Sequence, residues 1–583
     1  MPVTQSLKRR FHAAAESLRL RLSRPDALFW PAVMGLLTGL AAGLLIVAFR
    51  LAVEGAQASM LPDHGENYEA LAPWLRLILP LVGALLIGLL FIRLARGIHV
   101  LGVARVMERM EYHQGQMPAR ELLLQFTGAA LAIVSGHSVG REGPHVYLGA
   151  ASGSLIGQGL GLPNNSLRNL AACGTAAGIS ASFNTPLAGV IFALEILGLE
   201  YRVASFVPII LAAVSANAVA VAVFGSAPVL KVAPEMSFSL GELLPVVVLG
   251  LLAGVLSAAY VQLLQGVSRL GRPLDFMTRM WVAGVAAGLM GVLVPEVMGL
   301  GYDTLQDLLV MPQTWLFLVI LLLAKLLATS ISAGLGIPGG TIGPALFMGA
   351  VLGHLIGVLA VELIGLDADQ VAFFALLGMG AMMGASLQAP LAALTAIVEL
   401  THSPGVIMPG MLEIILAGLI SKEVFGKDSL FLTTLRANGL DYRANPVVQV
   451  LRRSAVGGVM NRSFARCPTR LARPEAERLV REGTEWIIIE APESESPTTL
   501  MPGIALASAL SRDPGADALD LLAIPAERLE LAPVHLQATL QEALDLMQTR
   551  GAEALYVQRP IAPGIPHIYG VLTRERIESA YRY

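Results

Sequence analysis

GREGP at residues 140–144 opens an apolar segment, and GTIGP at residues 340–344 opens another one 200 positions later. A second pair of motifs follows, because TPLAGVIFALE at 185–195 is matched by APLAALTAIVE at 389–399. The 200-residue shift also holds for two pairs of glycines, Gly149 with Gly349 and Gly153 with Gly353. The chain therefore contains two related halves, each with a Gly-Pro break that leads into an apolar helix.

The two breaks have the residue types of a helix start that can attract an anion. Proline is favoured in the first helical turn, and glycine leaves backbone N–H groups exposed. The N-terminus of a helix carries a partial positive charge and free N–H donors. We therefore expect Gly140, Arg141, Gly143 and Gly340 to lie at a small-anion site where the two breaks converge. The alternative is a pair of ordinary helix starts at a membrane surface.

Glu142 stands inside the first break, next to a stretch with few charges. Between Glu142 and Glu195, the one charged residue is Arg168. A carboxylate within the membrane is costly and usually has a task. The carboxylate can occupy the amides that bind the anion, and protonation would release it, so we expect Glu142 to act as a pH-sensitive gate. The alternative is an exposed loop glutamate.

Composition indicates a membrane protein. Of the 583 residues, 55% are hydrophobic and 14% are charged, whereas soluble domains have about 25% charged residues. Many segments reach the roughly 20 apolar residues that span a bilayer, and longer ones with Gly or Pro indicate broken helices. The fold class we expect is an all-α polytopic membrane protein, followed by a C-terminal α/β domain.

Charge and cysteine content limit the partners. A net charge of −3 gives no reason to expect a nucleic-acid partner. The two cysteines, Cys173 and Cys467, have no metal-ligand spacing, so we expect neither a metal site nor another cofactor. Residues 1–26 form a basic segment without a signal-peptide cleavage site, which favours a cytoplasmic N-terminus.

The composition changes near Arg436, where charged residues become frequent. Within the last part, a helix at Arg473–Glu482 precedes TEWIIIE, and a helix at Leu540–Arg550 precedes ALYVQ. This is a repeat of about 70 residues. The expected domains are a basic helix (1–26), a membrane domain (27–440, with halves at about 30–225 and 240–440), a linker (441–454) and a cytoplasmic domain (455–583).

GREGP, FNTPLAGVIFALE and GIPGGTIGP, in this order, resemble the CLC family of chloride channels and chloride/proton antiporters over residues 30–440. The region 455–583 resembles a tandem CBS domain. The resemblance implies inverted repeats of about 18 helices and a homodimer with one pore in each subunit. It also implies a place in the cell (inner) membrane with both termini cytoplasmic. Glu142 would be the gating glutamate, and the amides of Thr341 and Ile342 would contribute to the central anion site.

Three positions depart from the family pattern. Leu101, followed by Gly102, stands where many members have a serine that donates to the central anion, and Phe431 replaces a tyrosine. A hydrogen bond to a charged acceptor is worth about 1.5–3 kcal/mol, so we expect weaker anion binding at Leu101, Gly102 and Phe431. Ile196 replaces the inner glutamate of the antiporters, and Glu195 reads as a structural carboxylate like Glu399.

The function we predict is transport of chloride or a similar small anion across the lipid bilayer, channel-like and without obligatory proton coupling. A chloride/proton antiporter is the alternative. An intramembrane serine hydrolase is a distant one, because GHSVG at 136–140 matches a nucleophile pattern and His354 lies on an apolar segment. In the CBS-like region, Arg576 stands where nucleotide-binding members have an aspartate, which argues against an adenine nucleotide.

Overall fold

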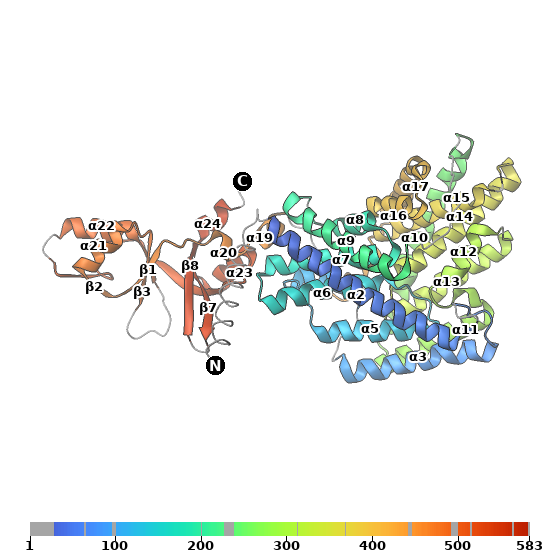
Figure 1. The fold of residues 1–583 in the computed structure, drawn as a ribbon, viewed down its shortest axis with the longest axis horizontal. Helices are drawn as coiled ribbons and strands as arrows, with labels where there is room; N and C mark the ends of the chain where they lie inside the picture. The colour runs from blue at the N-terminus through green and yellow to red at the C-terminus, as the bar shows by residue number, and fades with distance from the viewer. Residues whose placement is uncertain are drawn as a thin grey trace. The chain divides into compact units, whose positions relative to one another are not determined.

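The computed structural model describes residues 28–62, 66–95, 101–199, 201–226, 238, 240–311, 313–367, 369–440, 446–490, 499–513, 516–562 and 565–580. The basic segment 1–26 lies outside these residues. The chain divides into two compact units (Figure 1). We call Pro31–Gly157 together with Arg168–Arg443 the membrane unit, and the unit that contains Ala444–Tyr583 the tail unit. The expected boundaries at 27 and 440 lie near this division, and the four-part domain assignment stays a prediction.

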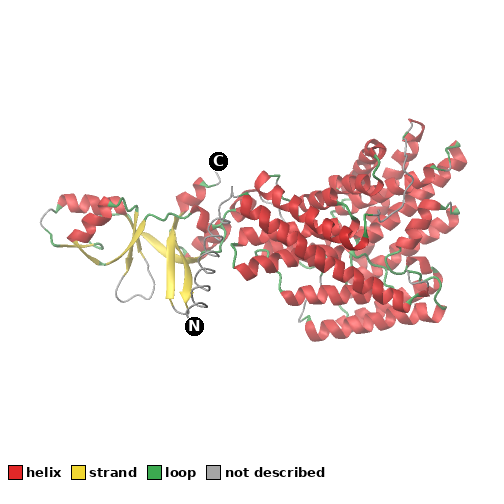
Figure 2. Ribbon diagram, viewed as in Figure 1, coloured by secondary structure: helices red, strands yellow, loops and turns green. Residues whose placement is uncertain are grey.

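Helices form the described part of the membrane unit, while strands occur in the tail unit (Figure 2). The first half contains α2 (Phe29–Met60), α3 (Pro73–Leu94), α4 (Val103–Tyr112), α5 (Ala119–Val134), α6 (Glu142–Leu160), α7 (Asn164–Phe183), α8 (Pro186–Ile196) and α9 (Val203–Phe224). The second half contains α10 (Leu243–Gly271), α11 (Phe276–Leu293), α12 (Tyr302–Val310), α13 (Trp315–Leu335), α14 (Ile342–Ile364), α15 (Gln370–Leu387), α16 (Pro390–Thr401) and α17 (Ile407–Leu419). The helix α18 (Leu430–Ala437) follows the second half. Nine of the described helices are long and apolar enough to cross a membrane.

Residues with a positive φ recur at equivalent points of the two halves, which confirms the internal repeat. Gly136 and Gly336 end α5 and α13 with φ of 81° and 97°. Asn184 and Gln388, at 59° and 55°, precede α8 and α16. Residues other than glycine rarely adopt a positive φ. Its occurrence at both Asn184 and Gln388 therefore indicates that the two halves have the same backbone conformation at these points.

The two halves run in opposite directions where they meet. Gly140 and Gly340 pair in an antiparallel bridge, with N···O distances of 2.7 and 2.6 Å. Glu195, near the end of α8, accepts hydrogen bonds from the N–H groups of Leu391 and Ala392 at the start of α16. Glu399 caps α8 in the same way. The expected inverted repeat is therefore confirmed, and Glu195 is a helix-capping carboxylate.

Glycines allow the helices of each half to pack closely around the breaks. A Cβ added to Gly149 on α6 would lie 2.1 Å from the carbonyl oxygen of Gly174 on α7. The equivalent distance from Gly349 on α14 to the carbonyl oxygen of Gly378 on α15 is 2.2 Å. Since no side chain fits into these contacts, the glycine pattern of the sequence reflects helix packing as well as the repeat.

The tail unit contains a six-stranded sheet with the strand order β1-β3-β4-β6-β7-β8. Its strands are β1 (Phe464–Pro468), β3 (Trp486–Glu490), β4 (Thr499–Pro502), β6 (Leu529–His535), β7 (Ala554–Ala562) and β8 (Ile565–Thr573), and β2 (Arg470–Ala472) pairs separately with β5 (Ala518–Asp520). Its helices are α19 (Pro446–Arg453), α20 (Val456–Val459), α21 (Arg473–Arg481), α22 (Gly503–Arg512), α23 (Leu540–Arg550) and α24 (Arg574–Ser579). The predicted helix-then-strand repeat is confirmed by α21–β3 and α23–β7. The predicted linker, 441–454, contains the helix α19.

Candidate functional site

Glu142 is fully buried at the first residue of α6, and its carboxylate reaches the helix of the other half. Oε2 accepts a hydrogen bond from the backbone N–H of Gly343, with an N···O distance of 3.0 Å. Oε1 accepts one from the Tyr302 hydroxyl at 2.7 Å. Gly343 lies in the first turn of α14, where unbonded N–H groups give the helix end a partial positive charge. The carboxylate thus occupies an anion-attracting helix start.

The amides of Gly140 and Gly340 are already used, because each donates to the carbonyl oxygen of the other glycine. Their part in the expected anion site is therefore to hold the two breaks together. Thr341 is the N-cap residue of α14, and Ile342 is its first residue. In the sequence, Thr341 and Ile342 lie between Gly340, which forms the bridge, and Gly343, whose N–H donates to Glu142.

One cavity of about 470 Å³ lies against Tyr302 and Arg141. Its charged lining residues are Arg50, Glu54, Glu66 and Arg141. Arg50 forms an ion pair with Glu54, and the guanidinium of Arg141 lies over the ring of Tyr302, 4.8 Å from its centroid. We call this space the charged cavity.

A second cavity, of about 140 Å³, brings together most of the residues that were expected at the anion site. Its lining includes Leu101, Gly102, Gly143, Gly340, Thr341, Ile342 and Phe431. Among its lining residues Arg279 is the one with a charged side chain. We call this space the inner cavity; its wall combines glycines, apolar side chains and hydroxyl or amide side chains.

Glu142 stands between the two cavities. Its neighbour Arg141 lines the charged cavity, while its other neighbour Gly143 lines the inner cavity. The backbone therefore passes from one cavity to the other across Glu142. A buried carboxylate bonded to α14 therefore lies between a residue that lines the charged cavity and one that lines the inner cavity.

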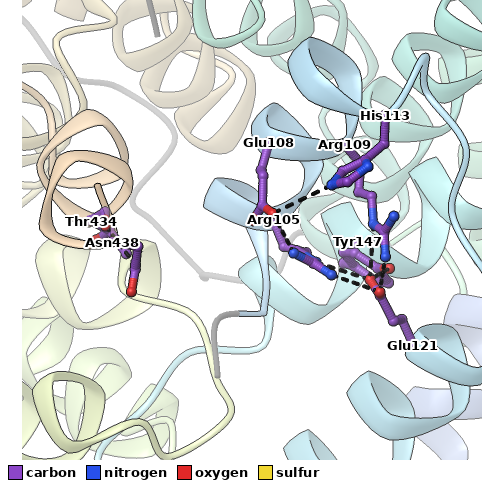
Figure 3. Close-up of polar contacts among 8 residues, drawn as sticks. All are labelled: Arg105, Glu108, Arg109, His113, Glu121, Tyr147, Thr434 and Asn438. Carbon is purple, nitrogen blue, oxygen red and sulfur yellow. Dashed lines mark hydrogen bonds and ion pairs between the residues drawn. The ribbon is translucent and has the colours of Figure 1, made fainter. Parts of the chain in front are cut away.

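The helix start next to the inner cavity is held by polar side chains. Gly102, with φ of 77°, precedes α4, and its N–H donates to Oε1 of Gln125 at 2.7 Å. On the same helix, Arg105 and Arg109 bind the carboxylate of Glu121, which also accepts a hydrogen bond from Tyr147 (Figure 3). These ion pairs fix α4 against α5 and α6 without themselves lining either cavity.

The remaining expected residues lie elsewhere. Ile196 is buried at the end of α8 and is not among the residues that line either cavity. The Ser138 hydroxyl is hydrogen-bonded to that of Thr329, whereas His354 contacts the Leu308 carbonyl oxygen and the Gln313 N–H. Ser138 and His354 thus have separate structural partners, and their geometry gives no support to a nucleophile–base pair.

Tyr302 was not singled out by the sequence reasoning, although a signal for it existed. Leu300-Gly301 precedes α12 just as Leu101-Gly102 precedes α4, and Gly301 has φ of 75°. The repeat therefore marked the start of α12 as the counterpart of an expected anion-site segment. What it did not indicate is that the residue after the glycine contacts Glu142.

Glu66, in the segment between α2 and α3, holds the turn that precedes Tyr302. Its Oε1 accepts hydrogen bonds from the N–H groups of Leu300 and Gly301. Burial, with a smaller contribution from the negative charge of Asp303, raises the pKa of Glu66 to about 7. The turn that precedes Tyr302 is thus held by a carboxyl group whose pKa lies above its usual range.

Comparison with known proteins finds a matching family model and similar sequences. A family model described as voltage gated chloride channel matches residues 83–422. A putative chloride channel protein, ClcB-like, of Ralstonia nicotianae is 34% identical over 421 residues, which are 70% of this chain and 96% of the relative.

Two solved structures have a similar fold. One, a slow cyanobacterial Cl⁻/H⁺ antiporter, aligns with a TM-score of 0.63 at 22% identity and covers 70% of this chain and 97% of its own. The other, a eukaryotic CLC transporter, aligns with a TM-score of 0.57 at 18% identity and covers 94% of this chain and 97% of its own. The second alignment extends into the tail unit.

Proposed function

Because this chain belongs to the voltage-gated chloride channel (CLC) family of anion-transporting membrane proteins, we propose that it carries chloride through a pore gated by Glu142. The protein is a multi-pass membrane protein. We place it in the cell (inner) membrane as a homodimer with one pore in each subunit. Both termini would face the cytoplasm, in keeping with the basic residues before α2.

The observation that carries this proposal is the position of the Glu142 carboxylate on the Gly343 amide, between the charged cavity and the inner cavity. In this place an ionised carboxylate competes with chloride for the same donors. When the carboxylate is protonated it no longer needs them, and the helix start is free for the anion. The gate would then open as the pH falls.

Chloride in the inner cavity would meet the backbone at Gly340, Thr341 and Ile342, together with the side chains of Leu101 and Phe431. Neither of these side chains has a hydroxyl group. With fewer donors the ion is held less tightly, which favours rapid passage over retention. This supports a channel-like protein.

We further propose that chloride flow is not obligatorily coupled to protons. In a dry helix bundle, protons move through titratable side chains or water chains, and Ile196 can supply no proton. The second candidate is a chloride/proton antiporter. It is favoured by the fold that this chain shares with a structure described as a Cl⁻/H⁺ antiporter.

A reversal-potential measurement on the protein in planar bilayers, with opposed chloride and pH gradients, separates the two candidates. For uncoupled flow the reversal potential follows the chloride gradient alone, so a shift of the pH gradient leaves it unchanged. A reversal potential that moves with the pH gradient would establish the antiporter.

Glu142→Gln tests the gate in the same bilayers. The variant mimics the protonated state, so its chloride flux should exceed that of the wild type at pH 7 and lose its dependence on pH. A well-folded variant that carries less chloride than the wild type would contradict the assignment of the gate.

A further inference from the structure

Tyr302 donates a side-chain hydrogen bond directly to the carboxylate of the proposed gate. Its hydroxyl donates to Oε1 of Glu142 at 2.7 Å, while the backbone N–H of Gly343 donates to Oε2. Each carboxylate oxygen thus has its own donor, one from α12 and one from α14. Bonds of this kind, to a charged acceptor, are stronger than bonds between neutral groups.

The position of Tyr302 is fixed from three sides. Gly301 adopts a left-handed conformation that starts α12 at Tyr302, and the carboxylate of Glu66 holds the N–H groups of Leu300 and Gly301. The Arg141 guanidinium lies over the ring at 4.8 Å from its centroid. The hydroxyl therefore reaches Glu142 from a preorganised ring, with little conformational entropy left to lose.

We propose that Tyr302 is the latch of the gate: its hydroxyl holds the Glu142 carboxylate in the closed position. This proposal rests on the function proposed for Glu142. Leu101 and Phe431 leave the inner cavity without the hydroxyl donors of related proteins, and Tyr302 supplies a hydroxyl from the opposite, charged cavity. In this chain a hydroxyl group therefore donates to the proposed gate, at Tyr302.

The latch favours one protonation state. A hydroxyl that donates to Oε1 stabilises the ionised carboxylate more than the neutral acid, because the acceptor carries the charge. Removal of the hydroxyl should therefore weaken the closed, ionised form. As a result, the pH at which half of the maximal flux is reached should rise.

Other ionisable groups surround the gate and stay unchanged in this comparison. Around Glu142 these groups are Arg141 just before α6, His145 on α6, Asp303 on α12, Lys325 on α13, Arg50 and Glu54 on α2, and Glu66 before α3. Because a Tyr302→Phe change removes one oxygen and leaves all of these charges in place, a shift in midpoint is assigned to the lost hydroxyl.

The test compares the pH dependence of chloride flux in liposomes for the wild type and Tyr302→Phe. We expect the midpoint of the variant to lie about one pH unit higher, with about tenfold more flux on the alkaline side, as expected for one bond to a charged group. In a Glu142→Gln background, Tyr302→Phe should change neither quantity, since the neutral amide is no longer a gate.

Tyr147→Phe is the matched control. The Tyr147 hydroxyl donates to Oε2 of Glu121, also at 2.7 Å, so the same atom is removed from the same kind of bond (Figure 3). Glu121 lines neither cavity. The midpoint of this variant should therefore stay at the wild-type pH.

Each outcome separates the latch from the gate. If Glu142→Gln raises flux while Tyr302→Phe keeps the wild-type midpoint, the latch is overturned and the gate stands. If Glu142→Gln leaves flux unaltered, the proposed gate itself fails. If Tyr302→Phe does not fold, 3-fluorotyrosine at position 302 is the substitute, because it keeps the shape of the ring and makes the hydroxyl a stronger donor. The midpoint of the pH dependence should then fall. An unmoved or raised midpoint would refute the latch.

Discussion

At the proposed gate, one backbone amide and one hydroxyl bind the carboxylate. The Gly343 amide and the Tyr302 hydroxyl each donate to one oxygen of Glu142, and Arg279 is the one charged residue among those that line the inner cavity. Helix starts provide a diffuse positive potential, which attracts an anion without a strong ion pair that would retain it. At this scale, the number of donors decides the strength of binding.

The double change Leu101→Ser with Phe431→Tyr should tighten chloride binding, because both positions line the inner cavity. Each added hydroxyl contributes about 1.5–3 kcal/mol to a charged acceptor, so the two together should lower the Kd by at least about a hundredfold. Isothermal titration of the detergent-solubilised protein with chloride measures this. Leu264→Ser, which adds a hydroxyl elsewhere on the same cavity wall, is the control; an equal gain there would contradict the placement of Leu101 and Phe431 at the ion.

Glu66 predicts a pH dependence of stability. Its pKa is raised from 4.5 to about 7 in the folded protein, so the folded state binds more protons than the unfolded state between these values. The free energy of unfolding should therefore decrease as the pH rises from about 4.5 to about 7. Glu66→Gln removes this contribution, and its apparent melting temperature should fall less than that of the wild type from pH 5 to pH 8.

The control for this measurement is Glu362→Gln, which changes an exposed carboxylate near the end of α14. Its melting temperature should follow the wild type at every pH. Parallel curves for Glu66→Gln and the wild type would show that the buried turn before α12 is not the source of the dependence.

At the scale of elements, helices within each half contact each other closely where glycine removes the side chain. Gly349 on α14 approaches the backbone of α15 so closely that a Cβ would lie 2.2 Å from a carbonyl oxygen. Gly418, on α17, has no neighbouring atom within 4 Å of such a Cβ. Gly349 and Gly418, two glycines in apolar helices, are therefore expected to respond oppositely to the same change.

Gly349→Ala should prevent α14 and α15 from packing, and the purified yield of folded protein should fall severely. Gly418→Ala should be neutral or slightly stabilising, because alanine favours the helix by about 1 kcal/mol over glycine. Size-exclusion profiles and melting curves in detergent compare the two. A Gly349→Ala protein as stable as Gly418→Ala would mean that α14 and α15 do not pack as described.

The sequence indicated those elements whose signal is local. Glycine and proline restrict the backbone at their own positions, so GREGP and GTIGP predicted the starts of α6 and α14 and their relation by repeat. The cross-capping of α16 by Glu195 and of α8 by Glu399 depends on how the halves face each other, which no short motif encodes. The sequence suggested that Glu195 and Glu399 were equivalent structural carboxylates, but not which helices they cap.

In the candidate site too, the sequence predicted some residues but not the contacts between distant parts of the chain. Leu101, Thr341 and Phe431 were expected together through the family resemblance, and they line one cavity. The contact of Tyr302 with Glu142 joins residues 160 positions apart and could be found only from the folded chain. The repeat of Leu101-Gly102 as Leu300-Gly301 was a local sign that pointed to the right segment.

On the scale of the whole molecule, the described residues of the pore and of the tail belong to separate compact units. Each residue assigned to the anion path, from Leu101 to Phe431, lies in the membrane unit. A chain that ends before Ala455 should therefore still conduct chloride in liposomes, at a rate per folded protein within about twofold of the full chain, since single-pore conduction needs no distant surface.

The same preparations test the tail for a ligand. The Arg576 guanidinium donates to the carbonyl oxygen of Val459, and ATP added to the full-length protein should leave its flux unchanged. A truncated protein that is well folded yet inactive would assign the tail a direct role in conduction, and a strong response to ATP would contradict the reading of Arg576.

The bridge between Gly140 and Gly340 has a consequence for the speed of the gate. Because the two hydrogen bonds tie both helix starts together, the aperture cannot widen by moving one half against the other without breaking them. Only the side chain of Glu142 is left to swing, and rotations about side-chain bonds are far faster than the microsecond-to-millisecond displacement of domains. Opening would then break the hydrogen bonds of Glu142 to Tyr302 and Gly343, which costs enthalpy, so the open probability of single pores should rise on warming.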